Sequence, residues 1–269
     1  MTGIILAAGY ATRLYPLTRD FPKPLLEVAG RSILDRIVDN ARRVSGMQRL
    51  VVVTNSRFAS HFEAWRDARF GAGPTGHAGG RGSGAGRAAD SAGPRVDIIN
   101  DGSTSNANRI GALADLHLAV EEADVDGDAL VLAGDNLFDF ELADFAAFFR
   151  DAGCDCITAH ELSDVEQLRR TGVAELADDG RVLHFAEKPA EPRSTWAVPP
   201  FYAYTRRTLR ERLPAFLRQG GEGDAPGSFL PWLIERAPVY AFRFEGARHD
   251  IGNRESYERV SRLFAAGNY

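Results

Sequence analysis

The sequence predicts an α/β fold in which a mixed, mostly parallel sheet lies between layers of helices. Short runs of aliphatic and β-branched residues alternate with segments whose apolar residues recur every three or four positions. The first runs are apolar at successive positions, so each strand needs helices over both of its faces, as in parallel sheets. With 269 residues, of which 44% are hydrophobic, the chain is long enough to bury such a core.

The first 150 residues predict four strands separated by helices. The strands are expected at 4–6, 50–53, 96–99 and 129–132. Apolar positions at helical spacing define three buried helix faces: Ile33, Leu34, Ile37, Val38, Ala41 and Val44; Ile110, Leu113, Leu116 and Val120; and Phe145, Phe148 and Phe149. Ser32 is placed to cap the first helix and Gly46 to end it. The alternation of strand and helix predicts parallel pairing through crossover connections.

After residue 153 strands become more frequent. We expect strands at 156–161, 173–176, 182–187, 198–204 and 239–244, and helices at 206–217 and 254–264. No linker separates the two parts, so the chain is interpreted as a single domain over 1–269, with halves 1–150 and 151–269. In such sheets ligands bind beyond the carboxyl ends of the strands.

The glycines are unevenly distributed. Nine of the 27 lie in the segment 71–94, which holds no Leu, Ile, Val, Met or aromatic residue. Such a segment buries too little apolar surface to offset its ordering entropy, so it is predicted to be a flexible surface insert. Its GAGPTG run satisfies G-x-G-x-x-G, but it stands in a glycine tract and not between a strand and a helix. We therefore interpret the match as chance.

Charge and composition exclude several classes of function. The chain has 32 basic and 37 acidic residues, a net charge of −5, and no basic stripe for a nucleic acid. No apolar run approaches the ~20 residues of a membrane span, and no secretory signal is recognisable. Cys154 and Cys156 are expected to be reduced thiols in a cytoplasmic protein. The oligomeric state stays open, a homo-oligomer included.

The segment 3–30 carries the clearest chemical signal. A buried strand runs into Ala7-Ala8-Gly9, where small residues let backbone N–H groups approach an anion, and the cations Arg13 and Lys23 follow. Three prolines in this stretch predict a rigid, extended loop that holds Lys23 in place. A phosphate-rich ligand is the natural partner, and a plain tight turn with surface cations is the alternative.

The segment LAAGYATRLYPLTRDFPKPLLEVAGRSILDRIV closely resembles the opening signature of the nucleotidylyltransferases that make sugar nucleotides, the glucose-1-phosphate thymidylyltransferase type and its relatives. Later matches follow in order: LAGDN at 132–136, TGVAEL at 171–176, EKP at 187–189 and HDIGNRESY at 249–257. The resemblance implies a Rossmann-like (GT-A-like) nucleotidyltransferase domain, with a nucleotide-binding half at 1–150 and an acceptor-binding half at 151–269. It implies transfer of a nucleoside monophosphate from a triphosphate to the phosphate of a small acceptor, first of all a sugar 1-phosphate.

The resemblance also implies roles for single residues. Arg13 would clamp the β- and γ-phosphates, Lys23 would contact the α-phosphate, and Asp135 and Asp250 would hold Mg²⁺. The expected site residues are Leu6, Ala7, Ala8, Gly9 and Gly134 for the nucleotide and Gly172, Glu187 and Lys188 for the acceptor. Alternatives are that Asp135 caps a following helix, that Glu187 and Lys188 form an exposed pair, and that His249 is a packing residue.

Two departures from the family pattern leave the substrates open. The usual base-reading run after the third strand is replaced by NDGSTSNANRIGAL, where Thr104, Asn106 and Asn108 offer polar groups to a base or ribose, with a pyrimidine favoured. Part of this run resembles cytidylyltransferases that act on phosphocholine or phosphonates. Aromatic residues in the second half suit either a quaternary ammonium or the core: Trp196, Phe201, Tyr202, Tyr204 and Trp232. A third reading is a non-catalytic nucleotide-binding module.

Overall fold

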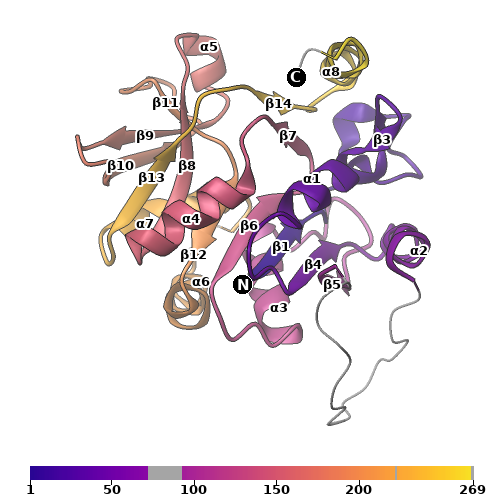
Figure 1. The fold of residues 1–269 in the computed structure, drawn as a ribbon, viewed down its shortest axis with the longest axis horizontal. Helices are drawn as coiled ribbons and strands as arrows, with labels where there is room; N and C mark the ends of the chain where they lie inside the picture. Colours follow the sequence, from indigo (N-terminus) through magenta and orange to yellow (C-terminus); the bar gives the residue numbers. More distant parts are fainter. Residues whose placement is uncertain (72–92, 222, 268–269) are drawn as a thin grey trace.

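A computed structural model describes residues 1–71, 93–221 and 223–267 (Figure 1). Apart from its ends, the predicted glycine-rich insert 71–94 lies outside the described residues. The strands are β1 (Thr2–Leu6), β2 (Glu27–Val28), β3 (Arg31–Ser32), β4 (Arg49–Thr54), β5 (Arg95–Asn100), β6 (Ala129–Ala133), β7 (Asn136–Phe138), β8 (Asp155–Glu161), β9 (Gly172–Leu176), β10 (Val182–Glu187), β11 (Trp196–Val198), β12 (Phe201–Tyr204), β13 (Val239–Arg243) and β14 (Arg248–Asp250). The α-helices are α1 (Ile33–Ala41), α2 (Ala59–Phe70), α3 (Ala112–Glu122), α4 (Leu142–Ala152), α5 (Val165–Leu168), α6 (Leu213–Arg218), α7 (Leu230–Ile234) and α8 (Arg254–Ala265).

One sheet of ten strands runs through both halves of the described chain. Its order is β10-β9-β11-β8-β12-β6-β1-β4-β5, with β13 paired to β8. Strands β6, β1, β4 and β5 pair in parallel, whereas β12 joins β6 to β8 with antiparallel pairing on both sides. The predicted mixed α/β sheet is confirmed, with most of its parallel pairing in the N-terminal half. The carboxyl ends of the parallel strands meet at one edge of the sheet, where the first loop of the chain begins.

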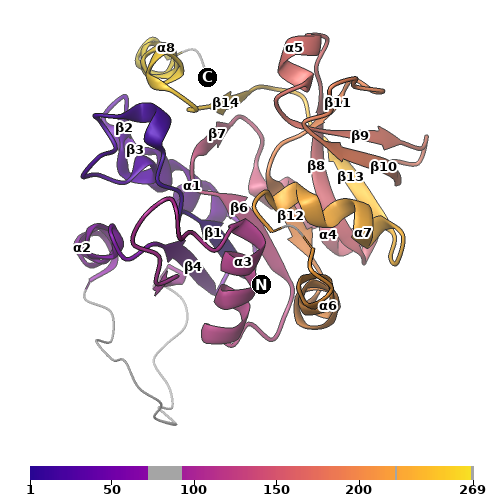
Figure 2. The same cartoon turned by 180° about the vertical axis from the view of Figure 1, so that it is seen from behind.

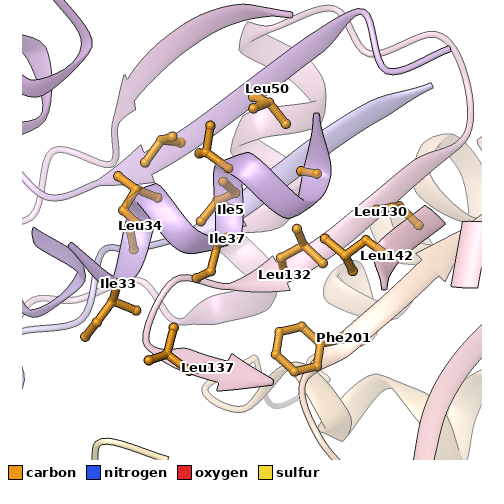
Figure 3. Close-up of a cluster of buried hydrophobic side chains, with 14 of the residues drawn as sticks. Ile5, Ile33, Leu34, Ile37, Leu50, Leu130, Leu132, Leu137, Leu142 and Phe201 are labelled. Atoms are coloured by element: carbon orange, nitrogen blue, oxygen red, sulfur yellow. The ribbon is translucent and has the colours of Figure 1, made fainter. Parts of the chain in front are cut away.

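Successive residues of the parallel strands face opposite layers of helices. Ile5 and Leu50 belong to the core under α1 and α4 (Figure 3), while Ile4 and Val51 pack toward α3 on the other face. Figures 1 and 2 show these two layers on opposite sides of the sheet. Each fully buried aliphatic side chain contributes about 1.5–3 kcal/mol to stability, so this two-sided core fixes the strand ends that carry the site.

The first helix follows its sequence signals closely. Helix α1 begins after Ser32, whose Oγ accepts a hydrogen bond from the backbone N–H of Asp35 at 3.0 Å. Its predicted apolar stripe is buried and lies along β1 and β4 (Figure 3). The predicted N-cap is therefore confirmed.

A small two-stranded ribbon of β7 and β14 lies outside the main sheet. Strand β7 leaves the end of β6 after a two-residue turn, and β14 pairs with it antiparallel, with Asp250 opposite Asn136 and Arg248 opposite Phe138. The ribbon joins segments about 112 residues apart in sequence and lies beside α1 and α8 (Figure 1). The sequence had not predicted either strand, because each has only three residues.

Four local expectations were wrong. Helix α1 ends at Ala41, five residues before the expected Gly46, and turns follow it. Lys23 lies in a one-turn 3₁₀ helix, Lys23–Leu25, and not in an extended loop, because Pro24 fits the second position of such a turn. Ile110 is exposed and precedes α3, and the strand expected at 198–204 is divided by Pro199 and Pro200 into β11 and β12.

The two cysteines do not form a disulfide bond: Cys154 and Cys156 are both free thiols, as expected. Within the part of the chain that the structure describes, no helix is long and apolar enough to cross a membrane.

Candidate active site

The loop after β1 has the small, anchored backbone that an anion site needs. The N–H of Ala7 donates to the carbonyl of Val53 at 2.9 Å, and the carbonyl of Ala8 accepts from the buried side-chain amide of Asn55 at 2.9 Å. Gly9 is exposed, and a Cβ added to it would meet nothing within 4 Å. Hydrogen bonds to Val53 and Asn55 therefore anchor the backbone at Ala7 and Ala8, and the loop reaches solvent at Gly9.

The turn after β6 crosses closely over the end of β1. The N–H of Gly134 donates to the carbonyl of Leu6 at 2.9 Å, and a Cβ at residue 134 would lie 3.0 Å from that same oxygen. A side chain here would therefore crowd the backbone of β1, and glycine lets the two backbones approach closely. This contact brings Asp135 beside the first loop.

Arg13 is an exposed cation of the first loop. It lies in the 3₁₀ turn Thr12–Leu14, and among the described residues no ion pair involves it. The turn is fixed by the hydroxyl of Thr18, which donates to the carbonyl of Ala11 at 2.8 Å. Arg13 is therefore free to meet an anion from solvent.

Lys23 and Asp135 form an ion pair at the junction of the two loops. Nζ of Lys23 donates to Oδ2 of Asp135 at 2.8 Å, with 7% of the lysine side chain and 42% of the aspartate side chain exposed. Burial alone would raise the pKa of Asp135, but the charges of Lys23 and Arg248 lower it below its ordinary value. A strand and no helix follows Asp135, so the helix-cap alternative is wrong.

Asp250 reaches the same place through the β7–β14 ribbon. Its Cα is paired with that of Asn136, the residue after Asp135, and directly opposed Cα atoms lie about 4.5–5.5 Å apart. Asn136 donates to Oδ1 of Asp135 at 2.6 Å. The backbone at Asp250 thus lies beside that of Asn136, which brings residues 115 positions apart in sequence to the same end of the ribbon.

The residues expected to bind an acceptor gather at β9 and β10. Gly172 begins β9, and a Cβ there would lie 2.5 Å from the ring of Phe185. Lys188 adopts a left-handed φ of 46°, its N–H donates to the carbonyl of Thr171, and its Nζ lies 3.8 Å from Glu187. Burial raises the pKa of Glu187. Because Glu187 is half-buried and Lys188 holds an uncommon backbone conformation, a simple exposed pair describes them poorly.

The loop after β5 holds the residues expected near the base. Asn108 uses its side-chain oxygen to accept from the N–H groups of Thr104 at 3.1 Å and Ser105 at 2.8 Å. Asn106 accepts from Arg109 at 3.2 Å and is exposed, as is Thr104. Asn108 therefore shapes the loop, while Thr104 and Asn106 face solvent.

Beneath this loop lies a polar cluster that the sequence reasoning missed. The hydroxyls of Tyr10 and Ser103 are 3.1 Å apart, and Asp101 accepts from both the N–H and the hydroxyl of Ser103. Burial and the neighbouring Asp101 raise the pKa of Asp115 to about 7. This cluster ties the first loop to the loop after β5.

The aromatic residues considered for a cationic acceptor are mostly core. Phe201, Tyr202 and Tyr204 are at most 3% exposed, and Trp232 stacks on Phe229. His249 sits edge-on to the ring of Phe264, with its Nε2 3.4 Å from Asp139. These contacts favour packing roles for the aromatic group and for His249.

The carboxylate pair has the donor chemistry of a magnesium site completed by substrate. Among the described residues no group of three or more His, Cys, Asp and Glu side chains is placed to hold a metal ion. Mg²⁺ is commonly bound by one or two carboxylates together with substrate phosphates and water. The pair Asp135 and Asp250 therefore fits this ion.

Comparison with known proteins shows the family of the chain. The model of the family described as nucleotidyl transferase matches residues 2–266. The chain belongs to the nucleotidyl transferase family. The resemblance found in the N-terminal signature is thereby confirmed along nearly the whole chain.

Curated relatives and solved structures agree with this membership. The chain is 27% identical to a glucose-1-phosphate adenylyltransferase of Rhodopirellula baltica, over 94% of the chain but only 58% of that relative's length. It is 28% identical to a UTP–glucose-1-phosphate uridylyltransferase of Haloferax volcanii, over 97% of the chain and 95% of the relative.

Two solved structures share its fold. A Bacillus anthracis structure assigned as a glucose-1-phosphate thymidylyltransferase superposes with a TM-score of 0.75 at 19% identity, over 100% of this chain and 97% of that one. A UDP-glucose pyrophosphorylase in complex with UDP-glucose gives 0.76 at 18% identity, over 99% and 98% of the two chains. At these identities the likeness concerns the fold alone.

Proposed function

We propose that this nucleotidyl transferase family member moves a nucleoside monophosphate from a nucleoside triphosphate to the phosphate of a sugar 1-phosphate and releases pyrophosphate. The observation that carries the proposal is that the β7–β14 ribbon sets Asp250 opposite Asn136, the residue after Asp135, while Asp135 pairs with Lys23 after the carboxyl ends of β1 and β6. A sugar 1-phosphate as acceptor is supported by the names of similar proteins, which mention glucose 1-phosphate or UDP-glucose.

The reaction needs charge neutralisation and alignment more than proton transfer. An oxygen of the acceptor phosphate forms a bond to the α-phosphorus, the bond from that phosphorus to the bridging oxygen breaks, and its electron pair leaves with pyrophosphate. The attacking phosphate is already ionised, so no general base is required. Bringing two polyanions together is the main barrier, and fixed cations and N–H groups lower it.

Each cation has a proposed task along the triphosphate. Arg13, exposed on the first loop, binds the β- and γ-phosphates, and Lys23 stabilises the charge that develops on the α-phosphate. The backbone around Leu6, Ala7, Ala8, Gly9 and Gly134 lines the nucleotide. Thr104 and Asn106 face the base, while Asn108 holds their loop.

Asp135 and Asp250 would hold Mg²⁺, which, when bound, supplies positive charge to the α-phosphate and to the leaving pyrophosphate. Asn136 keeps Asp135 oriented through the 2.6 Å hydrogen bond to its Oδ1. On the acceptor side, Gly172 and Glu187 bind sugar hydroxyls and Lys188 binds the acceptor's phosphate. A cationic acceptor such as phosphocholine is disfavoured, because three of the five aromatic residues considered for its ammonium, Phe201, Tyr202 and Tyr204, are buried in the core.

The proposal is tested by measuring pyrophosphate release. The protein is incubated with Mg²⁺, each of five common nucleoside triphosphates and a panel of sugar 1-phosphates, with phosphocholine and 2-aminoethylphosphonate as rival acceptors. We expect release with a sugar 1-phosphate and its loss when EDTA is added. Pyrophosphate release with only phosphocholine or the phosphonate would identify that compound, and not a sugar 1-phosphate, as the acceptor. No release with any combination of triphosphate and acceptor would favour a non-catalytic binding module.

A further inference from the structure

Arg248 lies where the proposed metal ligands and the proposed acceptor residues meet. It is on β14, two positions before Asp250, and residues two apart on a strand point to the same face. Its Nε donates to Oδ1 of Asn136 at 2.6 Å, and its NH1 donates to the hydroxyl of Thr171 at 3.2 Å. One guanidinium thus connects the residue after Asp135 with the residue before Gly172.

The guanidinium of Arg248 makes no close hydrogen bond to a carboxylate among the described residues. Only 17% of the Arg248 side chain is exposed, and both of its hydrogen-bond acceptors are neutral groups. The carboxylate paired with it among the described residues, Asp250, is 3.8 Å from NH2, too long for a hydrogen bond. Because both hydrogen bonds go to neutral groups and the ion pair is long, the guanidinium keeps N–H groups that an anionic ligand can accept from.

The two hydrogen bonds of Arg248 place it between two groups of proposed site residues. Nε reaches Asn136, which itself donates to Asp135. NH1 reaches the hydroxyl of Thr171, whose carbonyl accepts from the N–H of Lys188. The guanidinium therefore stands between the carboxylate pair and the Thr171–Lys188 region, where the acceptor phosphate and the α-phosphate must meet.

We propose that Arg248 binds the acceptor's phosphate together with Lys188 and orients its attacking oxygen toward the α-phosphorus. The proposal rests on the proposed function. Nε and NH1 are fixed by Asn136 and Thr171, so the remaining N–H groups of the fork are pre-oriented for phosphate oxygens. Lys188, whose side chain is 61% exposed, supplies a mobile charge, whereas Arg248 supplies a fixed one.

The test compares Arg248→Met, Arg248→Lys and a matched control, Arg212→Met. Arg212 is similarly buried, with 19% of its side chain exposed, and its NH1 donates to the hydroxyl of Thr208 at 2.8 Å and pairs with Asp155 at 3.4 Å, neither of which is a proposed site residue. We expect Arg248→Met to lower kcat/KM for the acceptor about 10- to 100-fold while KM for the nucleotide changes less than about threefold. Arg248→Lys should recover part of this loss, and Arg212→Met should lower only thermal stability.

Inhibition by inorganic phosphate separates phosphate binding from a purely structural role. In the wild type, phosphate should compete with the acceptor, and Arg248→Met should weaken this inhibition about tenfold or more. An Arg248 that only joins β7 to β9 would lower the melting temperature of the variant and leave both the inhibition and kcat/KM for the acceptor near wild type. That result would overturn the proposal.

A direct binding measurement keeps the two proposals distinguishable. Glucose 1-phosphate is titrated into wild type and Arg248→Met in a calorimeter, without nucleotide. If the wild type shows no turnover, the proposed function fails. Weaker binding to the variant still supports the role of Arg248, and equal binding refutes it. If Arg248→Met does not fold, the same comparison is made with Arg248→Lys, which keeps the charge and loses the fork.

Discussion

Lys23 donates to Asp135 at 2.8 Å across 112 positions of sequence, and the lysine is the more buried of the two partners. This ion pair holds together the two loops that follow β1 and β6. In the protein without substrate it also balances a carboxylate and an ammonium that we assign to the metal and to the α-phosphate. The pair therefore keeps both groups in place before any ligand arrives.

Removing either proposed metal carboxylate should abolish turnover while the fold survives. Asp135→Asn and Asp250→Asn each keep the shape of the side chain but remove an anionic ligand, so pyrophosphate release should fall about 100-fold or more. Asp126→Asn serves as control, because Asp126 is an exposed partner of Arg206. Circular dichroism should show unchanged folding. A variant that releases pyrophosphate at a near-native rate would show that the aspartate it replaces does not hold the metal.

Lys23 should matter for kcat more than for KM. Lys23→Met removes a charge that we assign to the transition state, so kcat should fall about 100-fold with little change in KM for the triphosphate. Lys23→Arg keeps the charge and should retain more activity. Steady-state kinetics of both variants check this. Equal rises in KM for both substrates with unchanged kcat would assign Lys23 to ground-state binding instead.

The acceptor strand offers a test based on packing. A Cβ at Gly172 would lie 2.5 Å from the buried ring of Phe185, so Gly172→Ala should lower the free energy of unfolding by about 1–3 kcal/mol and raise KM for the acceptor. Gly127→Ala is the matched control, since a Cβ there meets nothing within 4 Å. Urea unfolding compares the two variants, and equal losses would show that the contact with Phe185 is not the cause.

The sequence predicted the parallel half of the sheet well because its signals are local. Long apolar runs and helical stripes, such as the one capped by Ser32, each report on a single element, and in the parallel half the strands begin within one or two residues of their predicted starts. The family signature placed Asp135 and Asp250 in one site. Their meeting depends on the β7–β14 ribbon, whose strands are too short to leave a hydrophobic pattern.

Arg248 and Asp115 show why part of the site escaped sequence reasoning. Arg248 stands two positions before Asp250, a spacing that marks a shared face only once the segment is known to be a strand. Asp115 lies in a helix among apolar neighbours, and its partner Asp101 comes from the loop after β5. Contacts between side chains from different elements are set by the tertiary structure, so the spacing of residues in the sequence does not predict them.

The buried carboxyl of Asp115 predicts a specific pH dependence of stability. Its side chain is largely buried, its Oδ1 has no hydrogen-bond partner among the described residues, and burial together with Asp101 raises its pKa to about 7. The unfolded chain releases this proton near the ordinary value of 3.8, whereas the folded protein keeps it until about pH 7. Between these values the folded state binds more protons, so this residue lowers stability as pH rises, by up to about 1.4 kcal/mol per pH unit.

Asp115→Asn should remove that dependence, because the amide stays neutral and still offers a donor to Asp101. The free energy of unfolding is measured in urea for wild type and variant at pH 5 and pH 8. We expect the free energy of unfolding of the variant to rise relative to that of the wild type between pH 5 and pH 8. Only in the wild type does folding hold a proton that the unfolded chain releases at these pH values. A difference between the two proteins that is the same at both pH values would show that Asp115 ionises at its ordinary pKa in the folded protein.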